Sequence, residues 1–156
     1  MSITLAASFG GSALAEWQYH QKTDELRGTT RAFASVTSDN TVALSWPTGD
    51  VVPELVLRLD DPQTVKAYIY VEKAQLICGP YDVITVRFDS GPVEEYGCHN
   101  ADAGMMDTAF IQEPMRFLGR LKASSSVLVE ANFYRDGAQQ FAFPVGNLAW
   151  TLNPGN

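Results

Sequence analysis

The sequence predicts a mostly β protein: a single-domain antiparallel β-sandwich or partly open barrel with one short α-helix. Three observations support this prediction. Apolar and polar residues alternate through much of the chain, which is the period of a half-buried strand. Turn-forming residues recur every ~8–12 residues, a spacing typical of sandwiches and barrels. A single segment, at about 113–123, has helical periodicity instead.

The alternation indicates roughly nine short strands. It is clearest at 65–72, where every second residue is apolar and the others are charged or tyrosine. Residues 47–50 (Pro-Thr-Gly-Asp) are expected to end a strand, and 99–106 to form a loop. The other expected strands are at 30–36, 41–46, 54–59, 74–78, 83–89, 92–98, 127–134 and from 141.

The expected helix begins at Pro114, because proline at the first helical position loses no hydrogen bond. Its apolar residues fall on one stripe, and the serines at 124–126 end it. The members of the stripe are Met115, Phe117, Leu118 and Leu121.

Size and charge limit the possible functions. The chain has 156 residues, of which 46% are hydrophobic, as in one globular domain. Its net charge of −7 disfavours a nucleic-acid partner, which usually meets a basic stripe. We also expect no membrane-spanning helix, because no later window reaches ~18 apolar residues.

The first fifteen residues resemble the end of a signal peptide. They finish with the small-x-small pattern Ala13-Leu14-Ala15, but no lysine or arginine precedes it. We therefore expect 1–15 to be a signal-peptide remnant, 16–152 to be the folded domain, and the location to be the periplasm or another extracytoplasmic compartment. The alternative is a plain N-terminal strand or tail.

The two cysteines, Cys78 and Cys98, are the only ones in the chain. In an exported protein they would form a disulfide, and in a cytosolic one they would be buried thiols. The signal-like start favours the disulfide. A meander over 65–98 would place them on either side of its middle strand, so twist or a loop must bring their Cα atoms within ~7 Å.

No catalytic or cofactor motif is found in the chain. The best candidate cluster is Cys98, His99 and Asp102, whose side-chain types can bind Zn²⁺. It lacks the paired spacing of a zinc site, and a polar loop beside a disulfide accounts for the same residues. We therefore predict no catalytic residue, no metal and no cofactor.

Basic residues gather near the expected helix. Arg116, Arg120 and Lys122, with Arg135 further on, could form a basic face that binds an acidic partner. The alternative is an ordinary solvated helix face.

The three tryptophans offer a second possible surface. Packing in the core or at its rim is the simpler expectation for Trp17, Trp46 and Trp150. An exposed cluster of them with Tyr68 and Tyr70 would instead mark a binding surface.

The order of several segments resembles a known family. They are Trp17, Glu54–Arg58, Val86–Asp89 followed by Ser90-Gly91, the Pro114–Leu121 helix, and Phe141–Leu148. Over roughly 16–150 the chain is similar to the type VI secretion-associated TagO/VasI family and, more loosely, to invasion-associated locus B-like proteins. Phage and prophage genomes carry relatives of this type.

The resemblance implies a periplasmic β-sandwich-like domain with an accessory, protein-binding role and no catalytic residues. It also implies a recurring polar set, Arg58, Arg87 and Asp89, in which an ion pair with Arg58 across strands is the physical interpretation. The chain departs from the family at Leu59, where a cysteine would be expected.

Three functional hypotheses follow. The first is a non-enzymatic exported protein that binds another protein, in an envelope or secretion assembly or as a phage-encoded exclusion or inhibition factor. The second is a metal-binding or hydrolytic envelope protein that uses Cys98, His99 and Asp102. The third is a structural component of a virion.

Overall fold

The computed structural model describes residues 14–101 and 104–150. The described chain is mostly β with one helix, α2 (Pro114–Lys122), as the sequence predicts. The strands are β1 (Gln18–Asp24), β2 (Thr29–Thr37), β3 (Val42–Ser45), β4 (Thr48–Val51), β5 (Glu54–Asp61), β6 (Thr64–Tyr70), β7 (Val83–Phe88), β8 (Val93–Asn100), β9 (Thr108–Ile111), β10 (Ser126–Phe133) and β11 (Gly137–Pro144).

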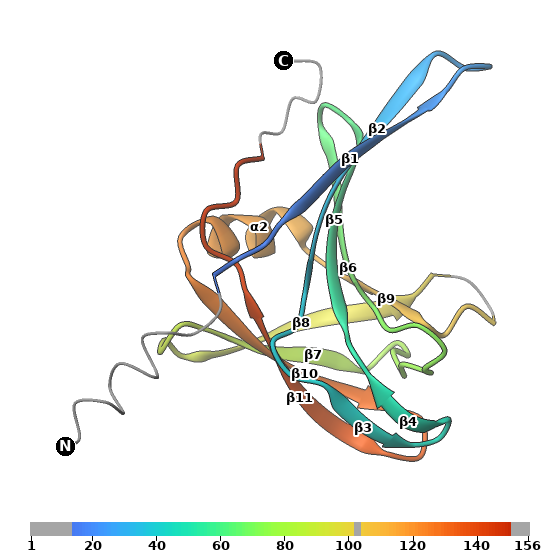
Figure 1. Ribbon diagram of the computed structural model, residues 1–156, viewed down its shortest axis with the longest axis vertical. Helices are drawn as coiled ribbons and strands as arrows, with labels where there is room; N and C mark the ends of the chain where they lie inside the picture. Colours follow the sequence, from blue (N-terminus) through green and yellow to red (C-terminus); the bar gives the residue numbers. More distant parts are fainter. Residues whose placement is uncertain (1–13, 102–103, 151–156) are drawn as a thin grey trace.

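Nine strands form one antiparallel sheet in the order β1-β2-β5-β6-β9-β8-β7-β10-β11, and β3 and β4 pair as a separate hairpin. The sheet is not closed into a barrel, since β1 and β11 are its two ends. It folds over at β8, whose first part pairs with β7 and whose end pairs with β9. The two halves pack face to face as a sandwich (Figure 1).

Gly97 lies where β8 changes partner. Its carbonyl accepts a 2.9 Å hydrogen bond from the backbone of Gln112, and a Cβ at this position would collide with the Gln112 side chain. Glycine therefore allows the close approach at the fold of the sheet.

The core lies between the two halves. Strand residues alternate between buried and exposed, so the apolar side of each half faces inward. Its largest fully buried aromatic side chains are Tyr96, Phe117, Phe133, Phe141 and Phe143.

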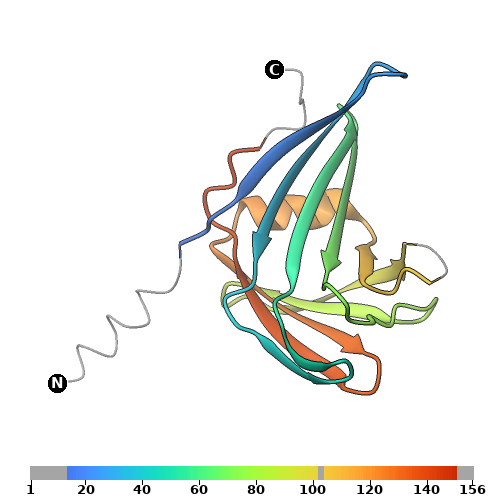
Figure 2. The same cartoon turned by 45° about the vertical axis from the view of Figure 1, so that its right-hand side comes forward.

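The first half of the sheet comprises β1, β2, β5, β6 and β9, and helix α2 packs on its inner side. In Figure 2 the helix lies behind β1, β2, β5 and β6, whose opposite side faces the viewer uncovered. Phe117, Leu118 and Leu121 are buried as expected, whereas Met115 is 52% exposed and does not belong to the buried stripe. The N-terminal residue of the stripe therefore lies beyond the edge of the core.

Several elements differ from the prediction. The strand expected at 41–46 ends at Ser45, before Pro47 as predicted, but a second strand, β4, begins at Thr48 after a tight turn. The expected strand at 74–78 is reduced to one bridge between Leu76 and Phe133. Strands β1 and β9 were not predicted.

The predicted disulfide is confirmed. Cys78 and Cys98 are bonded, with Cα atoms 5.4 Å apart. Cys78 does not lie on a paired strand; its backbone N–H donates to the Asn100 side chain at 3.3 Å, which holds this crossing segment against the end of β8. The expected signal remnant lies almost wholly outside the described residues. No helix in the described part of the chain is long and apolar enough to cross a membrane.

Candidate functional site

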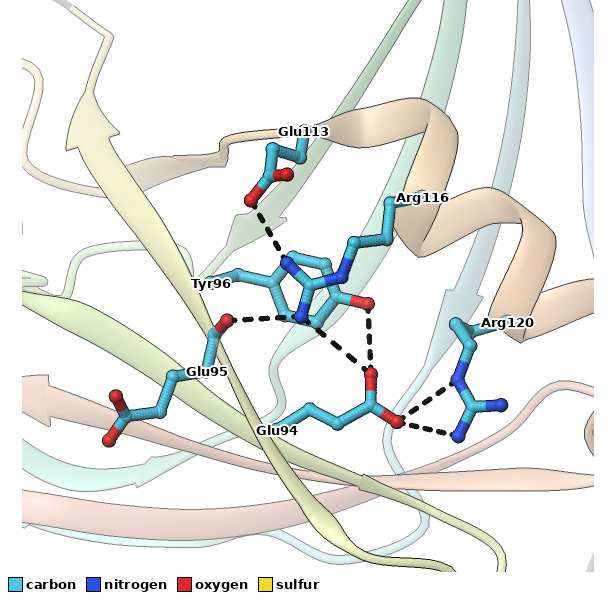
Figure 3. A network of polar contacts seen from close by, with 6 residues as sticks. All are labelled: Glu94, Glu95, Tyr96, Glu113, Arg116 and Arg120. Atoms are coloured by element: carbon cyan, nitrogen blue, oxygen red, sulfur yellow. Dashed lines mark hydrogen bonds and ion pairs between the residues drawn. The ribbon is translucent and has the colours of Figure 1, made fainter.

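The predicted basic face of α2 is already occupied by contacts within the chain (Figure 3). Arg120 donates to the carboxylate of Glu94 on β8 through Nε, at 3.0 Å, and through Nη2. Arg116 donates to Glu113 at 2.9 Å and lies 3.8 Å from Glu94. One carboxylate on the sheet therefore neutralises two arginines on the helix.

Aromatic rings complete this contact. The guanidinium carbon of Arg116 lies 4.0 Å from the ring centre of Tyr96, and that of Arg120 lies 5.1 Å from the ring centre of Phe88. The Tyr96 hydroxyl donates to Glu94 at 3.3 Å, and burial raises the pKa of Tyr96. We call Glu94, Tyr96, Glu113, Arg116 and Arg120 the helix network.

Arg116 and Arg120, the possible partner-binding residues of the sequence analysis, both belong to the helix network. Both arginines fasten α2 to β8, so they are neither a free basic face nor an ordinary solvated one. Of the three residues proposed for partner binding, only Lys122 is left without such a contact, and its side chain is exposed. A single lysine does not form a basic surface.

The polar set suggested by the family resemblance is also not assembled. Arg58 donates to Asp60 on its own strand at 2.7 Å, while Arg87 donates to the backbone of Gly91 at 3.0 Å. Asp89 accepts two 3.0 Å hydrogen bonds from the backbone at 125–126. The three residues serve separate local roles because β6, β9 and β8 lie between β5 and β7 in the sheet.

The candidate metal cluster is divided between the two sides of β8. The sulfur of Cys98 is bonded to Cys78 on the inner side, so it offers no thiolate, while His99 is exposed on the outer side. Asp102 lies outside the described residues. Within the described ranges, no three His, Cys, Asp or Glu side chains are grouped to hold a metal ion.

A different group of side chains crosses the outer side of the first half of the sheet. We call the following residues the outer stripe: His20 of β1, Phe33 of β2, Arg58 of β5, Tyr68 of β6, Phe110 of β9 and His99 of β8. Register explains the order, because neighbouring strands pair His20 with Phe33, Phe33 with Arg58, Tyr68 with Phe110, and Phe110 with His99.

Side-chain contacts join the residues at each end of the outer stripe, and the pairing of Phe33 with Arg58 links the two groups. His20 stacks on Phe33 with ring centres 4.5 Å apart, and at the other end His99 stacks on Phe110 at 5.4 Å. Between them, the guanidinium carbon of Arg58 lies 5.9 Å from the ring centre of Tyr68 and 5.7 Å from that of Phe110. Both histidines of the chain therefore lie on this one surface.

A shallow groove of about 390 Å³ lies beside the outer stripe. Met105, which is 49% exposed, forms one side of it. Burial raises the pKa of Tyr68, and that of Tyr70 as well, so both phenols remain neutral hydrogen-bonding groups at physiological pH. The groove is lined by Glu54, Val56, Arg58, Tyr68, Tyr70, Ala101, Met105, Thr108 and Phe110.

The tryptophans do not join this surface. Trp17 and Trp150 are each 9% exposed and belong to the core, as the simpler expectation had it. Trp46 is 38% exposed, but it contacts Tyr134 with ring centres 5.4 Å apart. The half-buried tyrosines at 68 and 70 therefore line the groove with Phe110 and Arg58 rather than gathering with tryptophan.

Sequence reasoning identified only part of the surface. It placed Tyr68 on the polar side of its strand, but β9 was not predicted, so Phe110 had no neighbours. The pairing of His20 with Phe33 depends on β1, whose residues are almost all exposed and show no alternation. Comparisons of the chain with family models, curated proteins and solved structures found no match.

Proposed function

We propose that this chain is a non-enzymatic, extracytoplasmic accessory protein that binds another protein through the outer stripe and its groove. We further propose that it works in an envelope or secretion assembly, or as a phage-encoded exclusion or inhibition factor. The family resemblance and the Cys78–Cys98 disulfide support this proposal, since disulfides persist in oxidising compartments.

The observation that carries the proposal is the outer stripe. Aromatic and arginine side chains are enriched at the centres of protein interfaces. Here they cross six strands on a side of the sheet that α2 does not cover (Figure 2). The groove beside them, with an exposed methionine on its rim, is suited to an apolar anchor of a partner.

Site-specific photo-crosslinking tests the surface. A photoreactive phenylalanine analogue placed at Met105 lies on the groove, and the same analogue at Val93, which is 66% exposed, lies on the outer side of the other half of the sheet. We expect one discrete protein adduct from Met105 and none from Val93, in cells that express the chain. Equal adducts at both positions, or none at Met105, would contradict the proposal.

The compartment has its own test. Free thiols are alkylated in intact cells before and after reduction, and the mass of the protein is measured. We expect modification of Cys78 and Cys98 only after reduction, because both are bonded in the folded chain. Modification without reductant would place the protein in a reducing compartment.

A further inference from the structure

Charge is unevenly arranged along the outer side of the first half of the sheet. The strand positions toward the β1–β2 turn carry four basic residues, Lys22, Arg31, Arg58 and Lys66, with Asp60 between the arginines. At the opposite end, Tyr70 is close to three acids, Glu54, Glu72 and Asp107, which help to raise its pKa. The groove joins the two ends, because Arg58 lines it on the basic side and Glu54 and Tyr70 line it on the acidic side.

The basic end has cationic side chains that are not fully neutralised by neighbouring acids. Asp60 is held at 2.7 Å by Arg58 and lies 3.3 Å from Arg31, so one carboxylate is shared by two guanidinium groups. The side chain of Arg31 remains 55% exposed. Lys22 is opposite Arg31 on the neighbouring strand, and no described acid lies within ion-pair distance of this lysine or of Lys66. Asp24 is occupied by Arg27 at the turn.

Register gives the distance between the basic end and the groove. Ser35 of β2 pairs with Val56, which lines the groove, and Arg31 lies four residues before Ser35 on the same strand. At ~3.3 Å per residue and ~4.8 Å per strand, the Lys22–Arg31 pair lies roughly 18 Å from the groove centre near Tyr68. An extended peptide crosses that distance in about five residues.

We propose that the partner contributes an extended acidic segment: an apolar anchor in the groove, and carboxylates about five residues away on one side only, over Lys22 and Arg31. Charge complementarity determines the direction, because carboxylates on the other side would meet Glu54, Glu72 and Asp107. This inference rests on the proposed function and names the chemistry of its partner.

Fluorescence anisotropy with labelled peptides tests the inference. One probe has a tryptophan, a Gly-Ser-Gly-Ser spacer and three glutamates, and a second has the reverse order. A third replaces the glutamates with lysines. We expect one of the acidic probes to bind the full chain, with affinity that falls as salt rises, and the lysine probe not to bind.

Variants locate the bound probe. Lys22→Glu and Arg31→Glu should each weaken binding by about tenfold, because an attraction becomes a repulsion. Met105→Glu should weaken it as well, by placing a charge on the rim of the groove. Lys122→Glu makes the same charge change on α2 and should leave binding unchanged. A circular dichroism spectrum of each variant verifies that it is folded.

Three results would overturn the acidic segment: no binding of either acidic probe, equal binding by all four variants, or tighter binding of an oligogalacturonate of equal charge, which would indicate an anionic glycan. The crosslink at Met105 separates this inference from the proposed function. An adduct that persists undiminished in Lys22→Glu and Arg31→Glu keeps the protein-binding surface and rejects the acidic partner. Absence of the adduct in the unaltered chain rejects the surface itself.

Discussion

Two regions of the molecule combine arginine, aromatic rings and carboxylates, and they differ in where the rings lie. In the helix network, Arg116 and Arg120 cover Tyr96 and Phe88, which are 1% and 3% exposed. In the outer stripe, Arg58 lies over Tyr68 and Phe110, which are only partly buried and border a groove. In the first region the arginines cover buried rings of the core, whereas in the second the arginine and the rings are accessible at the surface.

The balance of charge differs in the same way. Glu94, on the inner side of β8, joins two arginines of the helix to the sheet. Arg116 also forms an ion pair with a second acid, Glu113. On the outer side, Asp60 is shared by Arg58 and Arg31, and no acid in the described part of the chain lies within ion-pair distance of Lys22 or Lys66. Arginine next to aromatic rings is therefore not by itself a binding signal; the position of the rings relative to the core decides its role.

The largest expected effect on stability comes from disrupting the packing of α2 against the sheet. Phe117 is fully buried and contacts the rings of Phe88 and Tyr96. Phe117→Ala should lower the free energy of unfolding by about 3–5 kcal/mol, since it leaves a cavity. Met115→Ala, two residues away and half exposed, should change it by less than about 0.5 kcal/mol in the same denaturant titration. Similar losses for both variants would show that α2 does not pack as described.

The disulfide comes next. Cys78→Ser should lower the free energy of unfolding by about 2–4 kcal/mol under oxidising conditions, because the bond restricts the unfolded chain. Under reducing conditions the variant and the unaltered protein should be nearly equal. An equal loss in both conditions would mean that the thiols are free in the protein.

Removing the charge that joins α2 to β8 should have a moderate effect. Glu94→Gln keeps the size of the side chain but no longer neutralises Arg116 and Arg120. We expect a loss of about 1–2 kcal/mol, limited by solvent around the two partly exposed arginines. Glu95→Gln is the matched control, because only the backbone of Glu95 is used by the network. Equal losses of stability for the two variants would show that Glu94 does not join α2 to β8.

The smallest effect is expected at the turn next to the outer stripe. The backbone N–H of Arg27, and then its guanidinium, hold the pKa of Asp24 below its ordinary value of 3.8. The ionised carboxylate therefore stabilises the folded protein above pH ~4, and this stability is lost as pH falls through the lower folded pKa.

Asp24→Asn should therefore be slightly less stable than the unaltered protein at pH 7, and the difference should disappear as the pH falls through the lowered pKa of Asp24, as measured by thermal unfolding. It should also bind the acidic probe about twofold more tightly, because a carboxylate near Lys22 is removed. A stability difference that grows in acid would contradict the assigned role of Asp24.

The sequence was most informative where one side of an element is buried and the other is not. Strand β6 and helix α2 have this property, and their patterns predicted both closely. β1 is exposed on both sides and β9 is only four residues long, so neither has a pattern to read. Residues 74–78 alternate like a strand, but their backbone groups bond to separate segments at 106 and 132.

The site depended on register, which alternation does not supply. Arg120 and Glu94 are 26 residues apart in the chain, so a cluster of basic residues near the helix could not reveal that its charge is already balanced. Likewise, Phe33, Arg58 and Phe110 become neighbours only once the strand order is known. The disulfide could be expected because it is a choice between two states of a single pair.

The most direct test of the contrast between the two regions is a chemical-shift titration of the ¹⁵N-labelled protein with the acidic tryptophan probe that binds. We predict that the perturbed amides lie on β1, β2, β5, β6 and β9, around His20, Arg31, Tyr68 and Phe110, while those of α2 remain unchanged. Perturbations centred on Arg116, Arg120 and the start of β8 instead would show that the helix network is the binding surface and would contradict this account.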